Sequence, residues 1–255
     1  MNKQALIELK NISKVYSKVD METHALRDIN MAIYQGDYIS ISGPSGCGKS
    51  TLLSILGLLD TPTDGSYLIK GQQVANLTND DRAEIRNLHI GFIFQAFNLI
   101  DELSVYDNVA LPLKYREPKL SSKAVHEQVM SSLEKVAMQH RCSHKPNQLS
   151  GGQQQRIAIA RALVGKPSIL LVDEPTGNLD SKNGDLVMAL LDNLNKEGTT
   201  ICMVTHDPRY ADHAKIKLNL LDGIILDKLS LDSSLDSSLD SSLDSSLDNA
   251  LQEAV

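Results

Sequence analysis

The chain has 255 residues, enough for one large domain or for a domain with a subdomain, and 42% of them are hydrophobic, an ordinary share for a globular protein. Most of the net charge of −7 comes from residues 229–255, which contain six acidic residues and no Lys or Arg, so the rest of the chain is close to neutral. A near-neutral body lacks the basic footprint that nucleic-acid binding usually leaves, and we expect no nucleic-acid partner.

The cysteines and the hydropathy of the sequence indicate the cellular compartment in which we expect the protein. Cys47, Cys142 and Cys202 are widely spaced and form no C-x-x-C pair, which favours free thiols in a reducing environment. The first twenty residues lack the basic-then-apolar order of a signal peptide. Apolar runs all fall short of the roughly 18 residues that a membrane span requires. We therefore expect a cytoplasmic protein that reaches a membrane only through another chain.

Strands and a glycine-rich loop are predicted near the start of the chain. Alternating apolar and polar residues from Leu6 to Lys10 predict an edge strand. Tyr38 to Ile41 predicts a short strand, and Lys49 to Leu59 predicts the helix after it. Between them lies a complete G-x-x-x-x-G-K-[ST] motif, formed by Gly43, Pro44, Ser45, Gly46, Cys47, Gly48, Lys49, Ser50 and Thr51. This motif predicts a loop that binds nucleotide phosphates.

Helical periodicity follows in the middle of the chain. One helix is expected after a cap at Ser121 or Ser122, and its apolar positions are Val125, Val129, Leu133 and Val136. Another helix is expected to begin just after Ser150 and to carry Ile157, Ala158, Ala160 and Leu163.

Two later apolar runs predict strands that are buried on both faces. Ile169 to Val172 and Thr200 to Thr205 are continuous stretches of apolar or β-branched residues. Strands and helices thus alternate around the phosphate loop, and a helical block between Gln95 and Ser150 interrupts them. This order predicts an α/β core with an inserted α-helical subdomain at about residues 96–155.

The end of the chain is a repeat of Leu-Asp-Ser-Ser from Leu231 to Ser246. A spacing of four residues drifts by about 40° per step around an α-helix, so no stable apolar stripe forms. The Asp residues also repel one another at i,i+4. We expect residues 228–255 to be an acidic, low-complexity, disordered tail, with a helix formed on contact with a partner as the alternative.

The residue types of the loop suit the chemistry of a bound triphosphate. Its glycines let backbone N–H groups close around phosphates at a helix N-terminus. Lys49 supplies a positive charge to the β- and γ-phosphates, and the Ser50 hydroxyl is expected to bind Mg²⁺. Asp173, at the carboxyl end of a buried strand, is expected to hold the same ion.

Three motifs in this order resemble those of the ATP-binding cassette (ABC) ATPases. They are the phosphate loop, the Leu149-Ser150-Gly151-Gly152-Gln153 segment, and the strand Ile169–Val172 followed by Asp173-Glu174-Pro175. The resemblance runs from about Leu6 to about Asp227. It implies an α/β fold, the ABC-type P-loop NTPase core, with a helical subdomain and an N-terminal antiparallel β portion. The implied ATPase domain is residues 1–227.

The resemblance also implies roles for single residues. Glu174 matches the catalytic glutamate that polarises the attacking water. His206, after the second buried strand, matches the histidine that contacts the γ-phosphate. Gln95, in Gly91-Phe92-Ile93-Phe94-Gln95, matches the glutamine that senses Mg²⁺ and the water, and the family's membrane partner docks at the loop after it. Tyr16 matches the aromatic residue that stacks on adenine.

Other residues make sense only in a pair of chains. In this family Ser150, Gly151 and Gly152 cap the ATP that is bound to the opposite subunit, so that two nucleotides lie in a head-to-tail dimer. Asp180, in Asn178-Leu179-Asp180, matches the residue that crosses the seam. The resemblance therefore implies a homodimer with ATP and Mg²⁺ at its interface.

The segments around Gln95 and Asn108 resemble the bacterial subgroup of macrolide-exporter and lipoprotein-release ATPases. The leading interpretation is the ATP-hydrolysing subunit of a transporter or mechanotransmission complex at the inner face of the cell membrane, which drives a separate permease. Three alternatives remain: a cell-division ATPase that regulates envelope enzymes, a soluble non-transport ABC ATPase, and a regulator that no longer hydrolyses ATP. Intact Lys49, Asp173, Glu174 and His206 argue against the last of these.

Overall fold

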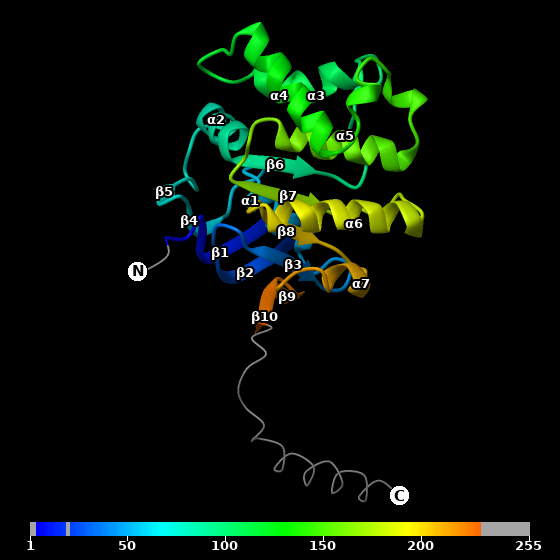
Figure 1. Ribbon diagram of the computed structural model, residues 1–255. Coiled ribbons are helices and arrows are strands. Elements are labelled where there is room, and N and C mark those ends of the chain that lie inside the picture. The colour runs from blue at the N-terminus through cyan, green and yellow to red at the C-terminus, as the bar shows by residue number, and fades with distance from the viewer. Residues whose placement is uncertain (1–3, 19–20, 231–255) are drawn as a thin grey trace, which may run out of the picture.

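A computed structural model describes residues 4–18 and 21–230 (Figure 1). One group of strands comprises β1 (Ile7–Lys18), β2 (Met21–Ile33), β4 (Asp64–Ile69) and β5 (Gln72–Gln73). A second group comprises β3 (Tyr38–Ser42), β6 (Ile90–Ile93), β7 (Ile169–Asp173), β8 (Thr200–Val204), β9 (Ile216–Leu221) and β10 (Ile224–Ser230). The helices are α1 (Lys49–Leu56), α2 (Asn79–His89), α3 (Val105–Lys114), α4 (Ser122–Lys135), α5 (Gly151–Leu163), α6 (Ser181–Lys196) and α7 (Pro208–Ala211). Short 3₁₀ turns, Gln139–Arg141 and Pro146–Gln148, precede α5.

The strands form two sheets, so the expected α/β fold is confirmed. The smaller sheet is antiparallel, with the order β2-β1-β4-β5, and the larger has the order β10-β9-β3-β8-β7-β6. From β9 to β6 the neighbouring strands of the larger sheet are parallel. Their carboxyl ends therefore meet at one edge, toward which the arrows of β6 and β7 point in Figure 1. Ligands of open parallel sheets bind beyond this edge.

Most of the strands and helices that we predicted from the sequence are present in the structure, and one prediction is wrong. The structure confirms the strands predicted at 38–41 and 169–172 and the helices predicted after residues 121 and 150. It also has the strand predicted at 200–205 and the helix predicted at 49–59, but they end earlier, at Val204 and Leu56. The prediction of an edge strand at Leu6–Lys10 is wrong, because β1 pairs with β2 on one side and with β4 on the other. Alternation reports that one face of a strand is buried, and it does not report how many neighbours the strand has.

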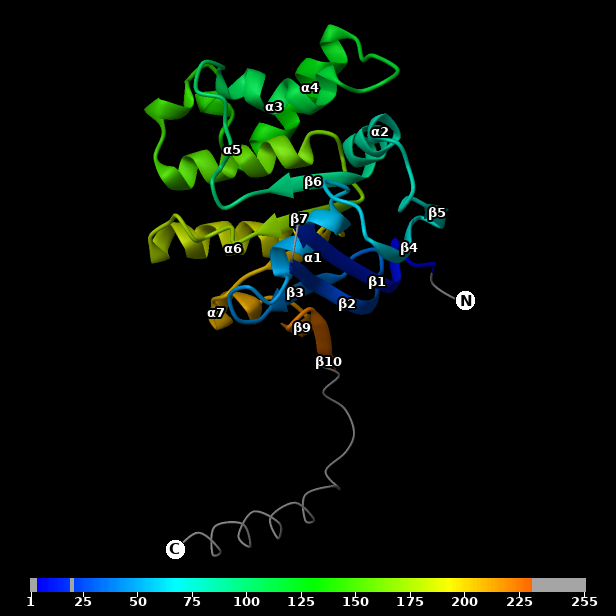
Figure 2. The same ribbon diagram turned by 180° about the vertical axis from the view of Figure 1, so that it is seen from behind.

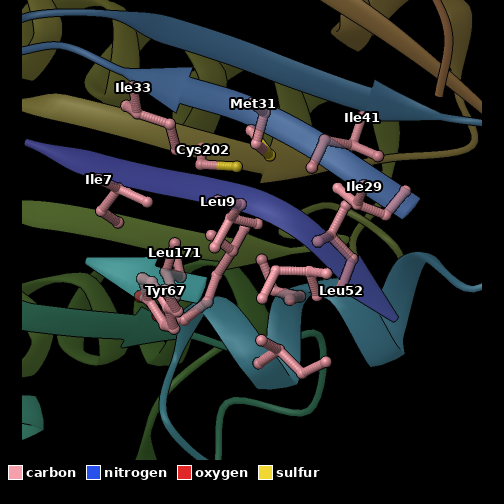
Figure 3. Close-up of a cluster of buried hydrophobic side chains, with 14 of the residues drawn as sticks. Ile7, Leu9, Ile29, Met31, Ile33, Ile41, Leu52, Tyr67, Leu171 and Cys202 are labelled. Atoms are coloured by element: carbon pink, nitrogen blue, oxygen red, sulfur yellow. The ribbon is translucent and has the colours of Figure 1, made fainter. Parts of the chain in front are cut away.

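Helix α1 lies between the two sheets and joins them into one core. Seen from behind, it passes between β1 and the strands of the larger sheet (Figure 2). Figure 3 shows Leu9 and Ile29 of the smaller sheet, Leu52 of α1, and Leu171 and Cys202 of the larger sheet in one cluster. All five side chains are almost completely buried. Burial of one such side chain contributes about 1.5–3 kcal/mol, so α1 is held firmly at both faces.

The helical block forms a layer of its own above β6 (Figure 1). Apolar residues of α3, α4 and α5 share a second core with the larger sheet, among them Val109, Leu133 and Ile157. Ser104, Ser121 and Ser150 cap these three helices by accepting hydrogen bonds from backbone N–H groups. The expected helical subdomain at about 96–155 corresponds to this region, although α5 continues to Leu163.

Strand β10 continues to Ser230, beyond the domain end that we expected at residue 227. The predicted disordered tail falls almost entirely on residues 231–255, which lie outside the described part of the chain. Among the described residues, none of the helices combines the length and the apolar character needed to cross a membrane.

Candidate functional site

The phosphate loop connects β3 to α1 at the carboxyl edge of the larger sheet. Gly46 and Gly48 have φ values of 81° and 105°, in the region that favours glycine. A Cβ at Gly48 would lie 2.4 Å from the carbonyl oxygen of Ala25, so the neighbouring strand also excludes a side chain there. At Gly46, by contrast, no described atom lies within 4 Å of such a Cβ. The exposed part of the loop, Pro44 to Gly46, therefore borders open space.

The N-terminus of α1 differs from those of the other α-helices. Its N-cap position is Gly48, and no side chain among the described residues caps it. A side-chain oxygen caps each of the helices α2 to α7. The first turn of α1, which includes Ser50 and Thr51, carries no acidic residue. The first N–H groups of a helix attract anions unless they are capped, so this end is suited to phosphates.

Lys49 reaches back over the loop that precedes it. Its Nζ donates hydrogen bonds to the carbonyl oxygens of Gly43, at 2.7 Å, and Pro44, at 2.8 Å. The same ammonium lies 3.8 Å from Sγ of Cys47, a side chain that is buried in the core. The positive charge is thus held beside the uncapped helix terminus, where both attract the same anion.

Asp173 ends strand β7 close to this lysine. Burial raises the pKa of Asp173, Glu174 raises it further, and Lys49 acts in the opposite direction. Asp173 and the Ser50 hydroxyl provide hard oxygen ligands, which suit Mg²⁺. Within the described residues, no group of three or more His, Cys, Asp or Glu could hold a metal by itself.

Glu174 follows Asp173 in an unusual conformation. Its φ of 43° lies in the left-handed region, which costs free energy for a residue other than glycine. Its N–H donates to the carbonyl oxygen of Val204, at 2.9 Å, and so ties it to the end of β8. Its Oε1 lies 3.0 Å from Nδ1 of His206. The carboxylate is largely covered, with 23% of the side chain exposed, whereas 67% of His206 is exposed.

Gln95 joins the same group from the loop that follows strand β6. An ideal Cβ on Gly177 would lie 2.6 Å from Nε2 of Gln95, so the two residues are in close contact. Asn178 donates to the carbonyl oxygen of Gln95, at 2.9 Å, and Gly177 donates to that of Glu174, at 3.1 Å. The structure therefore gathers Lys49, Asp173, Glu174, Gln95 and His206 at one edge of the sheet.

Tyr16 lies on β1, with 42% of its surface exposed. Its hydroxyl donates to Oδ2 of Asp60, at 2.8 Å. Burial and this hydrogen bond raise the pKa of Tyr16, while the Thr51 hydroxyl of α1 acts in the opposite direction. The ring is therefore close to the first turn of the helix that follows the phosphate loop.

The second glycine motif begins helix α5 and is closed by its own side chains. Ser150 and Gln153 form a capping box, in which the Ser150 N–H donates to Oε1 of Gln153, at 3.0 Å, and Oγ of Ser150 accepts from the Gln153 N–H, at 3.4 Å. Gly152 is buried, and a Cβ there would lie 2.4 Å from Oδ1 of Asn183. Asn183 in turn donates to both carboxylate oxygens of Asp180, the N-cap of α6.

Gly152 therefore has a packing role that the sequence did not indicate. It lets the start of α5 approach the start of α6 closely. Ser150 and Asp180 remain exposed at these two helix starts. Both residues are thus accessible at the surface, close to each other in the fold.

Two further residues support the site and were not predicted. Arg161 of α5 donates to the carbonyl oxygens of Phe97, at 2.8 Å, and Asn98, and so fixes the loop after Gln95. Gln155 of α5 is completely buried and donates to the carbonyl oxygen of Pro175, at 2.8 Å, beside Glu174. The sequence gives one signal for Gln155, which is a polar residue in line with the apolar positions Ala158 and Ile159 of the predicted helix. It gives no signal for Arg161.

Known proteins resemble this chain over most of its length. Residues 26–177 match the family described as ABC transporter, a range that includes the phosphate loop, Gln95, the Ser150 motif and Glu174, but neither Tyr16 nor His206. An uncharacterised ABC transporter ATP-binding protein of Methanocaldococcus jannaschii is 48% identical over 222 residues, which cover 87% of this chain and 98% of that protein.

Other relatives are longer than this chain. The macrolide export ATP-binding/permease protein MacB of Bdellovibrio bacteriovorus is 46% identical over 220 residues, which are 86% of this chain and 33% of the relative. The chain thus spans about a third of that protein. Among solved structures, a dimeric post-hydrolysis state of an ATP-binding cassette bound to ADP and Pi superimposes with a TM-score of 0.80 at 42% identity, covering 88% of this chain and 98% of that one.

Proposed function

The chain belongs to the ABC transporter family as an ATP-binding and ATP-hydrolysing subunit, and we propose that it drives a separate membrane permease through an ATP-gated homodimer. One observation carries the assignment of the site. The uncapped N-terminus of α1, Lys49 and Asp173 meet at the edge where Glu174 and His206 are in contact. A phosphate chain bound at α1 therefore extends toward a carboxylate and an imidazole, the groups that hydrolysis requires.

Each residue of the loop has a distinct task in this proposal. Backbone N–H groups from Ser45 to Thr51 surround the phosphates. Lys49 exchanges its two neutral carbonyl acceptors for the anionic β- and γ-phosphates, because an ammonium binds an anionic acceptor more strongly than a neutral one. Ser50 and Asp173 would hold Mg²⁺, with Gln95 near it, and the ion would neutralise charge on the phosphates when bound.

Glu174 is assigned to the attacking water. Its fixed backbone and largely covered carboxylate suit a general base, which must be held in one orientation. His206 holds Oε1 of that carboxylate through Nδ1, so its second ring nitrogen is free to face the γ-phosphate when the imidazole turns toward it. The left-handed φ of Glu174 is consistent with such a role, because strain of this kind is found at functional sites.

The second nucleotide contact comes from another copy of the chain. The Ser150 motif begins a helix, exposes its serine, and has no acidic residue in its first turn. In a head-to-tail dimer Ser150, Gly151 and the helix terminus would meet the γ-phosphate held by the partner's loop. Asp180 would cross the seam beside it. The dimeric cassette that resembles this chain supports the arrangement.

A sizing column with the Glu174→Gln protein tests the dimer. We expect a monomer without nucleotide and a dimer with ATP and Mg²⁺, because the bound triphosphate links the two chains. ADP should leave the protein monomeric, since it lacks the γ-phosphate. A stable dimer that is present without nucleotide, or a monomer at saturating ATP, would contradict the proposal.

A groove on the helical side suits the permease. It has a volume of about 820 Å³ and lies between α2, β6, α3 and α5. Phe94, next to Gln95, and Tyr115, of which 78% is exposed, line it. Arg86 and Arg116 stiffen its walls by donating to carbonyl oxygens of Leu58, at 2.9 Å, and of Gly165, at 3.0 Å. A short amphipathic segment of a membrane protein fits a groove of this kind.

Co-purification with a permease encoded beside this chain tests the groove. The Tyr115→Arg substitution should weaken the complex about tenfold or more, as expected for an aromatic residue at the centre of an interface. Leu186→Arg, on the exposed surface of α6, is the matched control and should have no effect. Equal loss in both variants, or loss in neither, would remove the groove from the interface.

The relatives do not favour the alternative functions. Both relatives above carry transporter names, and neither is described as a cell-division or non-transport ATPase. The substrate and the direction of transport belong to the permease. We propose that the chain is attached to the inner face of the membrane through that partner.

A further inference from the structure

The Tyr16 side chain is fixed on two sides although much of it is exposed. Its hydroxyl is bound to Asp60, and the Lys14 ammonium lies 4.9 Å from the centre of the ring. A cation at this distance over a ring face is attracted to the π electrons. One face of the ring is thus covered by Lys14, and a base can stack only on the other face.

Asp60 and Lys14 form a partly buried network beside the ring. Lys14 donates to Oδ1 of Asp60, at 2.7 Å, and to the carbonyl oxygen of Thr61, at 2.7 Å. Only 9% of Lys14 is exposed. Burial alone would raise the pKa of Asp60, but hydrogen bonds from Lys14, Tyr16 and the Thr61 N–H hold it below its usual value. The carboxylate is therefore ionised at neutral pH and accepts all three hydrogen bonds.

The segment that carries Asp60 is attached to both α1 and β1. The N–H groups of Leu59 and Asp60 donate to the carbonyl oxygen of Ser54, at 2.9 and 3.3 Å. On the other side, the Val15 N–H donates to Oγ1 of Thr63, at 3.0 Å, and the Thr63 N–H donates to the carbonyl oxygen of Ser13, at 2.8 Å. Helix α1 thus offers phosphate-binding groups at its N-terminus and, through the loop after its C-terminus, holds the aromatic ring.

We propose that Asp60, supported by Lys14, is a positioning residue that holds the Tyr16 ring in the orientation needed to stack on the nucleotide base. The inference rests on the proposed ATP-binding function and on the stacking role that the family resemblance implies for Tyr16. A ring that is ordered beforehand loses less conformational freedom on binding, which strengthens binding without adding a contact. In this role Asp60 acts through the ring and needs no contact with the nucleotide.

Calorimetric titration of the full chain with ADP and with pyrophosphate tests this, because pyrophosphate has the phosphates but no base. Tyr16→Phe keeps the ring and removes its hydroxyl, and Asp60→Ala removes the acceptor. Each should raise the Kd for ADP about two- to tenfold, the range for one side chain that must be ordered on binding. The Kd for pyrophosphate should not change. In a Tyr16→Ala background, Asp60→Ala should have no further effect on ADP binding.

The outcomes separate this inference from the role of Tyr16 itself. If Tyr16→Ala leaves ADP binding unchanged, the ring does not stack on the base, and both proposals fail. If Tyr16→Ala weakens binding while Tyr16→Phe and Asp60→Ala do not, the ring stacks but is not positioned by Asp60. An equal effect of Asp60→Ala with and without the ring, or on pyrophosphate, would show that Asp60 acts on the fold. Tyr16→Phe removes the interaction of the hydroxyl with Thr51 as well as that with Asp60, so an unchanged Kd for ADP in this variant would overturn the inference even if Asp60→Ala lowers stability.

Discussion

Two helices of this protein begin at glycine-rich motifs, but in the part of the chain that the structure describes only one of them has a side-chain cap at its N-terminus. Helix α1 starts at Gly48 without a side-chain cap, and Lys49 lies over the loop before it. Helix α5 starts at Ser150 with a complete capping box, and Gly152 is buried against Asn183. The first backbone N–H groups of α1 therefore have no side-chain acceptor among the described residues, whereas one of those of α5 is already hydrogen-bonded to Ser150.

This difference explains how the two motifs divide one task. An uncapped terminus with a lysine beside it binds phosphate strongly by itself. A capped terminus has fewer free N–H groups and contributes little until the phosphate is already held elsewhere. We therefore assign nucleotide affinity to α1 and the response to the γ-phosphate of a partner's ATP to α5.

The largest expected effect concerns the attack of water on the nucleotide held at α1, a step that we assign to Glu174. Glu174→Gln should lower turnover by about 10²–10⁴ because the amide cannot accept a proton from water. The Kd for ATP should change little, since the side chain acts on water. Glu127→Gln, on the exposed surface of α4, is the matched control. Steady-state hydrolysis near the wild-type rate in Glu174→Gln would exclude Glu174 as the general base.

The next effect separates the two motifs directly. Lys49→Met should weaken ATP binding to a single chain by roughly 30-fold or more, because it removes a charged partner of the phosphates. Ser150→Asp keeps the helix cap, since Asp is a good N-cap residue, but it places a negative charge where the partner's phosphate should come. Its ATP affinity, measured by calorimetry on dilute protein, should stay within about twofold of the wild type, while the ATP-dependent dimer is lost. Equal loss of ATP affinity in both variants would contradict the assignment of affinity to α1 alone.

A smaller effect is expected for the packing of Gly152, which has less space for a side chain than Gly151 in the same motif. Gly152→Ala should cost about 1–3 kcal/mol, because its Cβ would lie 2.4 Å from Oδ1 of Asn183. In a domain of this size that corresponds to a fall in Tm of roughly 2–12 °C. Gly151→Ala is the control, since the nearest atom to its Cβ, in Leu179, is 3.4 Å away. Equal Tm values for the two variants would remove the packing role of Gly152.

The smallest effect concerns the chain end, which belongs to neither motif. Removal of residues 231–255 keeps the whole of β10 and takes away six negative charges, which moves the net charge from −7 to about −1. We expect Tm and ATPase activity to change little, with a shift below about 0.5 kcal/mol in stability. Solubility should fall as the charge nears zero. A loss of several degrees in Tm would show that the Leu-Asp-Ser-Ser repeats contact the domain.

Much of the fold was predictable because its signals are local. The apolar run Ile169–Val172, the caps at Ser121 and Ser150, and the loop from Gly43 to Thr51 each carry their pattern within a few residues. The positions of Asp173, Glu174 and His206 followed from the ends of two parallel strands, since such ends meet at one edge.

Other features depend on contacts between distant segments and could not be predicted. The second neighbour of β1 comes from β4, nearly sixty residues later. Asp60 is 44 residues from Tyr16, and neither position has a pattern that points to the other. The left-handed φ of Glu174 and the contact between Gly152 and Asn183 likewise arise from tertiary packing.

The most direct test of the division between the two motifs is a mixture of inactive chains. Lys49→Met and Ser150→Asp proteins should each lack ATPase activity alone, because every site in either homodimer has one damaged half. In a heterodimer, one site combines both damaged halves and the other combines two intact ones. We predict that mixing the two proteins restores ATP hydrolysis to about one working site per heterodimer. Failure of the mixture to hydrolyse ATP, under conditions where heterodimers form, would contradict the assignment of the Ser150 motif to the nucleotide of the partner chain.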